Sequence, residues 1–141
     1  MKVSKFSIAV ASAVALSVLA ASARADDKLD ASKLPPASSQ KDVTYAKDIK
    51  AILDKSCVKC HGGEKPKGKL RLETLEGVLK GGKDGKAVVP GKSGESPLVF
   101  AVAHVGDEDD FMPPPNNKAN IPQLTKEQVG LIRAWIEQGA K

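Results

Sequence analysis

The chain has few cysteines and few aromatic residues, two classes of residue that stabilise many small proteins. Only two cysteines occur among its 141 residues, which excludes a framework of several disulfides. Aromatic residues make up 4% of the sequence, so few large side chains are present to fill a core. No apolar run reaches the roughly 20 residues that a transmembrane helix needs. A single domain of this composition would gain stability from a large apolar ligand at its centre.

The first 25 residues have the pattern of an export signal. A lysine-containing start precedes an apolar, alanine-rich run over 8–21, and small residues stand at Ala23 and Ala25, the positions that a signal peptidase recognises. We therefore predict a signal peptide over 1–25 and a mature protein over 26–141, located in the periplasm or otherwise outside the cytoplasm. Removing the signal leaves 19 basic and 17 acidic side chains, so the formal net charge falls from +5 to +2. This charge is too small to indicate nucleic acid as a partner, because that needs a concentrated basic face.

The start of the mature chain differs in composition from the rest. Residues 26–40 have the sequence DDKLDASKLPPASSQ, which is polar and contains a Pro-Pro and a Ser-Ser pair. Such a composition is typical of flexible segments. We predict a flexible linker over 26–42 and one domain over 43–141, with no transmembrane segment in either.

Apolar spacing and capping residues predict a mostly α-helical domain with long loops. Residues 44–59 place apolar side chains on one helix face, and a glycine pair follows their end. Thr74 is suited to cap a short helix that Gly81 would stop. Ser96 suits the N-cap of another short helix, with Pro97 in its first turn.

The last predicted helix has the clearest beginning. Thr125 and Gln128 match a capping box, and Leu124 and Val129 match the hydrophobic staple around it. Gly139 is expected to end this helix. No part of the chain shows a convincing pattern of parallel strands.

The most informative stretch is Cys57-Val58-Lys59-Cys60-His61, which contains both cysteines and one of the two histidines. Two intervening residues bring both sulfurs to one side of a helical turn, at the separation of two porphyrin vinyl groups. The histidine after the second cysteine can then reach the iron. This pattern predicts one covalently attached haem c, with thioethers at Cys57 and Cys60 and with His61 as the proximal iron ligand.

Three other chemistries use the same residue types. A disulfide between Cys57 and Cys60 would close a loop too short to stabilise the fold much. A thioredoxin-type redox pair is expected in a βαβ context, which the sequence lacks. A zinc site needs four ligands, and only His104 remains outside the motif to join it. Haem attachment is favoured over all three.

The second axial ligand would come from Met112 or His104. Met112 is followed by three successive prolines, which fix the backbone, and a residue before proline favours an extended conformation. A stiff loop suits a thioether, because its bond to iron is weak and must survive a change of redox state. Met112 is therefore favoured as the distal ligand. His104, at the end of an apolar helical stretch, is the alternative.

Several stretches together resemble the planctomycete-type cytochrome c domain, a small group similar to class I cytochromes c. They are DIKAILDKSCVKCHGG, LRLETLEGVLKGG, VVPGKSGESPL, FMPPP and LTKEQVGLIRAWIEQGA. The resemblance covers residues from about 45 to 140. It implies a mono-haem, mostly helical fold wrapped around the haem, with His61 as proximal and Met112 as distal ligand. It also implies that the first and last helices pack against each other near the haem.

An iron held on both axial faces has no open position for a substrate. We therefore expect a one-electron carrier, a monomer that serves redox partner proteins, rather than an enzyme. The alternative is a haem-based sensor or peroxidase-like enzyme with a displaceable distal ligand, for which His104 is the candidate polar group. The proposed apolar haem lining consists of Tyr45, Ile49, Leu53 and Trp135, together with Leu98, Val102, Val129, Ile132 and Ile136.

Overall fold

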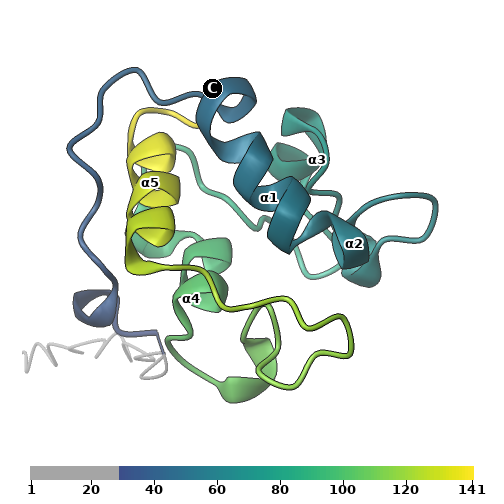
Figure 1. The fold of residues 1–141 in the computed structure, drawn as a ribbon. Coiled ribbons are helices and arrows are strands. Elements are labelled where there is room, and N and C mark those ends of the chain that lie inside the picture. The colour runs from purple at the N-terminus through teal and green to yellow at the C-terminus, as the bar shows by residue number, and fades with distance from the viewer. Residues whose placement is uncertain (1–28) are drawn as a thin grey trace, which may run out of the picture.

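The computed structural model of the chain describes residues 29–141, which form short helices joined by long loops (Figure 1). The α-helices of this part of the chain are α1 (Lys50–Ser56), α2 (Val58–His61), α3 (Leu75–Lys80), α4 (Pro97–Ala103) and α5 (Lys126–Glu137). Single helical turns are η1 (Ala31–Lys33), the π-turn η2 (Tyr45–Ile49), η3 (Lys67–Lys69), η4 (Ser93–Glu95) and η5 (Glu108–Asp110). Residues 29–141 contain no β-strand, and none of their helices has the length and apolarity to cross a membrane. The expectation of a mostly α-helical fold is confirmed.

The first predicted helix begins where expected but is not continuous. The Thr44 side chain caps η2 by accepting a hydrogen bond from the backbone of Lys47, and α1 and α2 follow. Cys57 separates α1 from α2 because its backbone (φ −128°, ψ −41°) leaves the α-helical region. The helix-like bonds continue across this kink, from Cys57 N–H to Leu53 C=O (2.8 Å) and from His61 N–H to Cys57 C=O (2.9 Å). Apolar spacing therefore could not distinguish this broken helix from a continuous one.

The last helix and the start of the domain share one core. Both bonds of the predicted capping box at Thr125 are present, and the staple residues Leu124 and Val129 are buried. The Trp135 ring of α5 packs beside Tyr45 of η2, with 6.0 Å between ring centroids. The C-terminal Lys141 carbonyl accepts hydrogen bonds from the backbone of Tyr45 (2.7 Å) and from Trp135 Nε1 (2.9 Å). The chain end is thereby fixed beside η2 (Figure 1).

The two short helices in the middle of the chain follow their predicted caps with one difference. Thr74 caps α3 by accepting from Gly77 N–H, and the helix ends at Gly81, whose φ of +84° favours glycine. Ser96 occupies the N-cap of α4 but makes no capping bond. Its hydroxyl instead donates to the Lys92 carbonyl (2.8 Å) and accepts from Val89 N–H (2.9 Å). The serine therefore ties the preceding loop to the start of α4.

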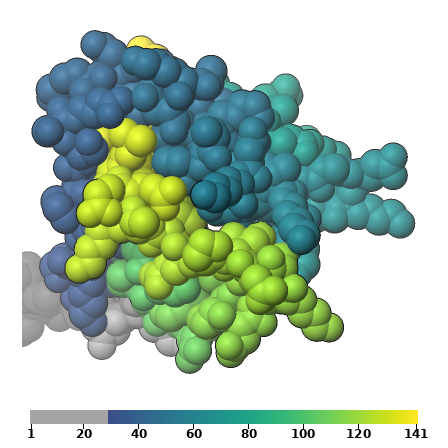
Figure 2. Space-filling view, in the orientation of Figure 1, coloured from purple at the N-terminus to yellow at the C-terminus, as the bar shows by residue number. Residues whose placement is uncertain are grey.

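Residues 29–42, here called the N-terminal arm, run beside α5 (Figure 2). Leu34 of the arm is buried, and Ser38 N–H donates to the Gly130 carbonyl (2.9 Å). The Arg133 guanidinium donates to an arm carbonyl, that of Pro35. Composition predicted a flexible linker here and did not reveal these contacts, because they come from α5, far along the chain. The boundaries of the linker remain a prediction, and the predicted signal peptide lies outside the described residues.

Candidate cofactor site

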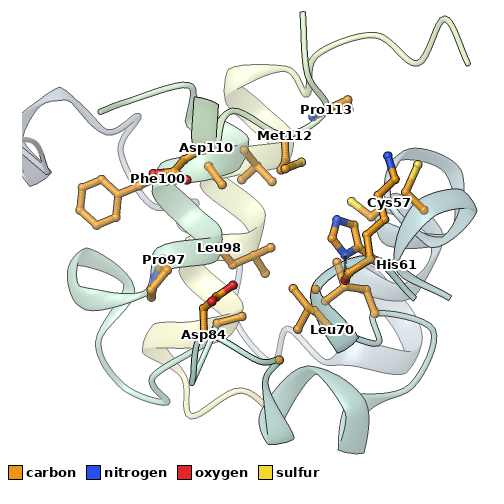
Figure 3. A pocket seen from close by; sticks show the side chains of 18 of the residues that line it. Cys57, His61, Leu70, Asp84, Pro97, Leu98, Phe100, Asp110, Met112 and Pro113 are labelled. Atoms are coloured by element: carbon orange, nitrogen blue, oxygen red, sulfur yellow. Dashed lines mark hydrogen bonds between the residues drawn. The ribbon is translucent and has the colours of Figure 1, made fainter. Parts of the chain in front are cut away.

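A cavity of about 440 Å³ opens between α2, α4 and the loop after η5. Its size lies within the range of about 300–1,000 Å³ that is usual for small-molecule and cofactor sites. Both cysteines, His61 and Met112 line it, together with mostly apolar side chains. Figure 3 shows Cys57 and His61 on the α2 side of this space and Met112 with Leu98 on the facing side. The cavity thus brings together four chemically distinctive residues that come from two separate segments.

The two cysteines reach the cavity because the chain turns at Cys57. Cys60 N–H donates to the Cys57 carbonyl (3.0 Å), so the two residues belong to one helical turn. Neither thiol forms a disulfide. Burial raises the pKa of the Cys57 thiol to about 12, and the neighbouring Cys60 adds to the rise. A buried thiol with a raised pKa forms little of the thiolate that reacts in thiol–disulfide exchange, so Cys57 itself does not have the environment of a redox-active cysteine.

His61 is oriented by the backbone around it. Its Nδ1 lies 3.2 Å from the Lys67 carbonyl, where an N–H at Nδ1 donates and the lone pair is left on Nε2. Its own carbonyl accepts from Leu72 N–H (2.8 Å), which ties α2 to the following extended segment. Desolvation lowers the pKa of His61, although hydrogen bonds to Lys67 and Leu70 partly oppose this effect. A neutral imidazole held through one nitrogen is the usual arrangement of a metal-binding histidine.

Met112 is held in a loop that is tied to α4 and closed on itself. Its backbone N–H donates to the Ala101 carbonyl in the last turn of α4 (3.0 Å). The Asn117 side chain donates to the carbonyls of Pro114 (2.9 Å) and Ile121 (2.8 Å). The same side chain accepts from Ile121 N–H (2.9 Å). These bonds, added to the prolines, keep the loop against the cavity.

His104, the alternative distal ligand, does not line the cavity. Its Nε2 lies 3.1 Å from the Pro113 carbonyl, and its ring stacks on Phe111 with 4.5 Å between centroids. It caps α4 in a left-handed conformation (φ 53°, ψ 49°). The imidazole therefore contacts the two sequence neighbours of Met112 and does not form part of the cavity wall.

The predicted apolar lining is only partly brought to the cavity. Leu98 and Val102 line it. The other proposed residues are buried in the hydrophobic core instead of lining the cavity, namely Tyr45, Ile49, Leu53, Val129, Ile132, Trp135 and Ile136. Helical spacing identified their buried face but could not identify what that face contacts. In the structure these residues belong to one core, in which α5 contacts η2. Leu70, Leu72 and Ile121 line the cavity and were not predicted.

The donor set fits a haem better than a bare metal ion. Among residues 29–141, no group of three or more histidine, cysteine or acidic side chains is arranged to hold a metal ion. Two thiols in one helical turn and an imidazole directly after them are what covalent haem attachment requires. The apolar cavity beside them, with a thioether on its facing side, suits a large apolar ring and an iron between two axial ligands.

Comparisons with known proteins agree with this donor set. Residues 57–116 match the family described as Planctomycete cytochrome C. This family indicates haem c binding and electron transfer rather than catalysis, and the two cysteines of the chain fit one attachment motif. No curated protein and no solved structure matches the chain. The matched segment contains the Cys57-to-His61 motif, α3, α4 and Met112, and the match supports a planctomycete-type cytochrome c domain in this chain.

Proposed function

We propose that this chain is an exported, monomeric, mono-haem c-type cytochrome that passes single electrons between redox partner proteins. The observation that best supports the proposal is the placement of both thiols, His61 and Met112 around one largely apolar cavity. The bound haem would supply reversible one-electron chemistry at its iron. The protein's own residues would attach the ring, orient the ligands and limit the access of water.

Each functional residue has a distinct proposed role. Cys57 and Cys60 would hold the ring through thioethers, and His61 would bind the iron through Nε2. Its Nδ1, directed at the Lys67 carbonyl, would keep the imidazole in this orientation. Met112 would bind from the facing side through its sulfur. A His/Met ligand pair raises the reduction potential, which suits a carrier rather than an oxygen-activating enzyme.

The covalent attachment is tested by extraction. The mature protein, expressed together with haem-attachment machinery, is denatured and treated with acidified organic solvent. We expect the pigment to remain on the polypeptide, and the double variant Cys57→Ala/Cys60→Ala to release it or to lack it. Pigment that washes out of the unaltered protein, or is absent from it, would overturn the proposal.

The distal ligand is tested with Met112→Ala. We expect loss of the weak ferric absorption band that reports sulfur on iron, a lower reduction potential, and binding of carbon monoxide to the reduced protein. Ile121→Ala is the matched control, because Ile121 lines the same cavity without offering a ligand. The control should keep the band, and an unchanged spectrum of Met112→Ala would refute the assignment.

Export is a separate part of the proposal. Cell fractionation should place the protein outside the cytoplasm, and N-terminal sequencing of the mature form should begin at Asp26. Retention of residues 1–25 in the isolated protein would contradict this part without affecting the haem site.

A further inference from the structure

We propose that His104 is a positioning residue that keeps Met112 at the cavity, and not a ligand itself. This inference rests on the proposed role of Met112 as the distal iron ligand. The geometry that supports it is the attachment of one imidazole to both sequence neighbours of the methionine.

The two contacts of His104 act on opposite sides of Met112. On one side, the Nε2 atom of His104 lies 3.1 Å from the Pro113 carbonyl, a distance at which an N–H donates to that oxygen. On the other side, the imidazole stacks on the Phe111 ring, with 4.5 Å between centroids and 13° between planes. The residues directly before and after Met112 in the sequence are thereby both in contact with the same imidazole. Figure 3 shows Met112 next to Pro113 at the cavity.

His104 is itself fixed by the end of α4. Its backbone N–H donates to the Ala101 carbonyl (3.3 Å), the same oxygen that accepts from Met112 N–H (3.0 Å). The next residue, Val105, donates to the Phe100 carbonyl (3.0 Å). Val99, Phe100 and Val102 of this helix are buried. The imidazole is therefore fixed at the end of a buried helix, and the same helix also binds the backbone of the methionine loop.

This arrangement matters because a thioether is a weak ligand. A loop free to move would let the sulfur leave the iron, and an open position would then accept small molecules. Residues that contact a ligand residue, but not the metal itself, commonly determine whether a site keeps its geometry. His104 supplies this support without entering the cavity, which agrees with its absence from the cavity lining.

The test is the variant His104→Asn in the haem-loaded mature protein. Asparagine tolerates the left-handed backbone of this position, but its side chain is too short to reach Pro113. We expect a weaker ferric sulfur–iron band, a lower reduction potential, and carbon monoxide binding to the reduced protein that is tighter by about tenfold. The Met112 amide should also exchange its hydrogen about tenfold faster, which is a readout that does not involve the iron.

A further variant separates positioning from general destabilisation. Gln138→Ala removes hydrogen bonds to Val43 N–H (3.2 Å) and to the Gln40 carbonyl (2.9 Å), and Gln138 does not line the cavity. It should lower stability while leaving the iron spectrum unchanged.

The outcomes distinguish a failure of the Met112 assignment from a failure of the proposed role of His104. If the unaltered protein lacks the sulfur–iron band, the assignment of Met112 fails, and this inference fails with it. If the unaltered protein shows the band and His104→Asn matches it in spectrum, potential, carbon monoxide binding and amide exchange, only the role of His104 is refuted. A spectral change in His104→Asn that Gln138→Ala reproduces would also refute it, because the effect would then be one of stability.

Discussion

Replacing Gly130 with alanine tests how the N-terminal arm is held on α5. A Cβ atom at this position would lie 2.7 Å from the Pro36 carbonyl oxygen and 3.5 Å from the Ser38 nitrogen. The first distance is shorter than Cβ contacts allow, and the atom it meets belongs to the backbone of the arm. The arm would therefore have to move away from the helix. This movement would lengthen the bond from Ser38 N–H to the Gly130 carbonyl and loosen the neighbouring bond that Arg133 donates to the arm.

Two opposing contributions decide the sign of the change in stability. Alanine in place of glycine inside a helix stabilises by about 1 kcal/mol where nothing obstructs it. Loss of the bond between Ser38 and Gly130 costs about 1 kcal/mol. Loss of the bond from the Arg133 guanidinium costs about 1.5–3 kcal/mol, because its donor is charged. We therefore expect a net loss of about 1.5–3 kcal/mol in the free energy of unfolding.

Urea denaturation of the haem-loaded mature protein measures this change, and limited proteolysis measures exposure of the arm. The matched control is Gly94→Ala, whose Cβ would contact only the Ala31 Cβ at an ordinary 3.5 Å. Gly94 thus also faces the arm but needs no movement, and its variant should show little change in either measurement. If Gly130→Ala proved more stable than the unaltered protein and no more sensitive to protease, the arm would not be packed on α5 and our reasoning would be wrong.

Three further predictions follow from other contacts. The Gly63 N–H donates to Glu73 (2.8 Å) and holds the pKa of this carboxyl below its ordinary 4.5. The resulting stability is present above the unfolded-state pKa and is lost as the pH falls through the folded-state pKa. The free energy of unfolding in urea should therefore fall less steeply at acidic pH in Glu73→Gln than in the unaltered protein. An equally steep fall in both proteins would contradict this. Thr125→Ala should cost about 1 kcal/mol in thermal unfolding, and Thr125→Ser should restore most of it; equal losses would argue against the cap. Trp135→Phe removes the donor to the Lys141 carbonyl and should lower the free energy of unfolding in urea by about 1–3 kcal/mol; unchanged stability would show that this bond does not hold the chain end.

The features that could be predicted from sequence are those set by near neighbours in the chain. The capping box at Thr125 depends on residues three apart, and the cap at Thr74 depends on its own helical turn, so both were predicted and are present. The Cys57-to-His61 motif is local in the same sense, since one helical turn brings its two thiols and its imidazole together. The match of residues 57–116 to planctomycete cytochromes agrees with the family that these motifs indicated.

The tertiary structure alone decided which side chains face the cavity and which fill the core. Trp135 and Ile49 have the apolar spacing that a haem contact would have, yet they are buried in the core, where α5 contacts η2. What a helix face contacts depends on segments far away in the sequence. The contacts of His104 with Phe111 and Pro113, and those of the arm with α5, also depend on where the chain folds back. A sequence pattern records the periodicity of an element and the residues that cap it. The direction in which a broken helix continues, and what it then meets, follow from packing over the whole domain.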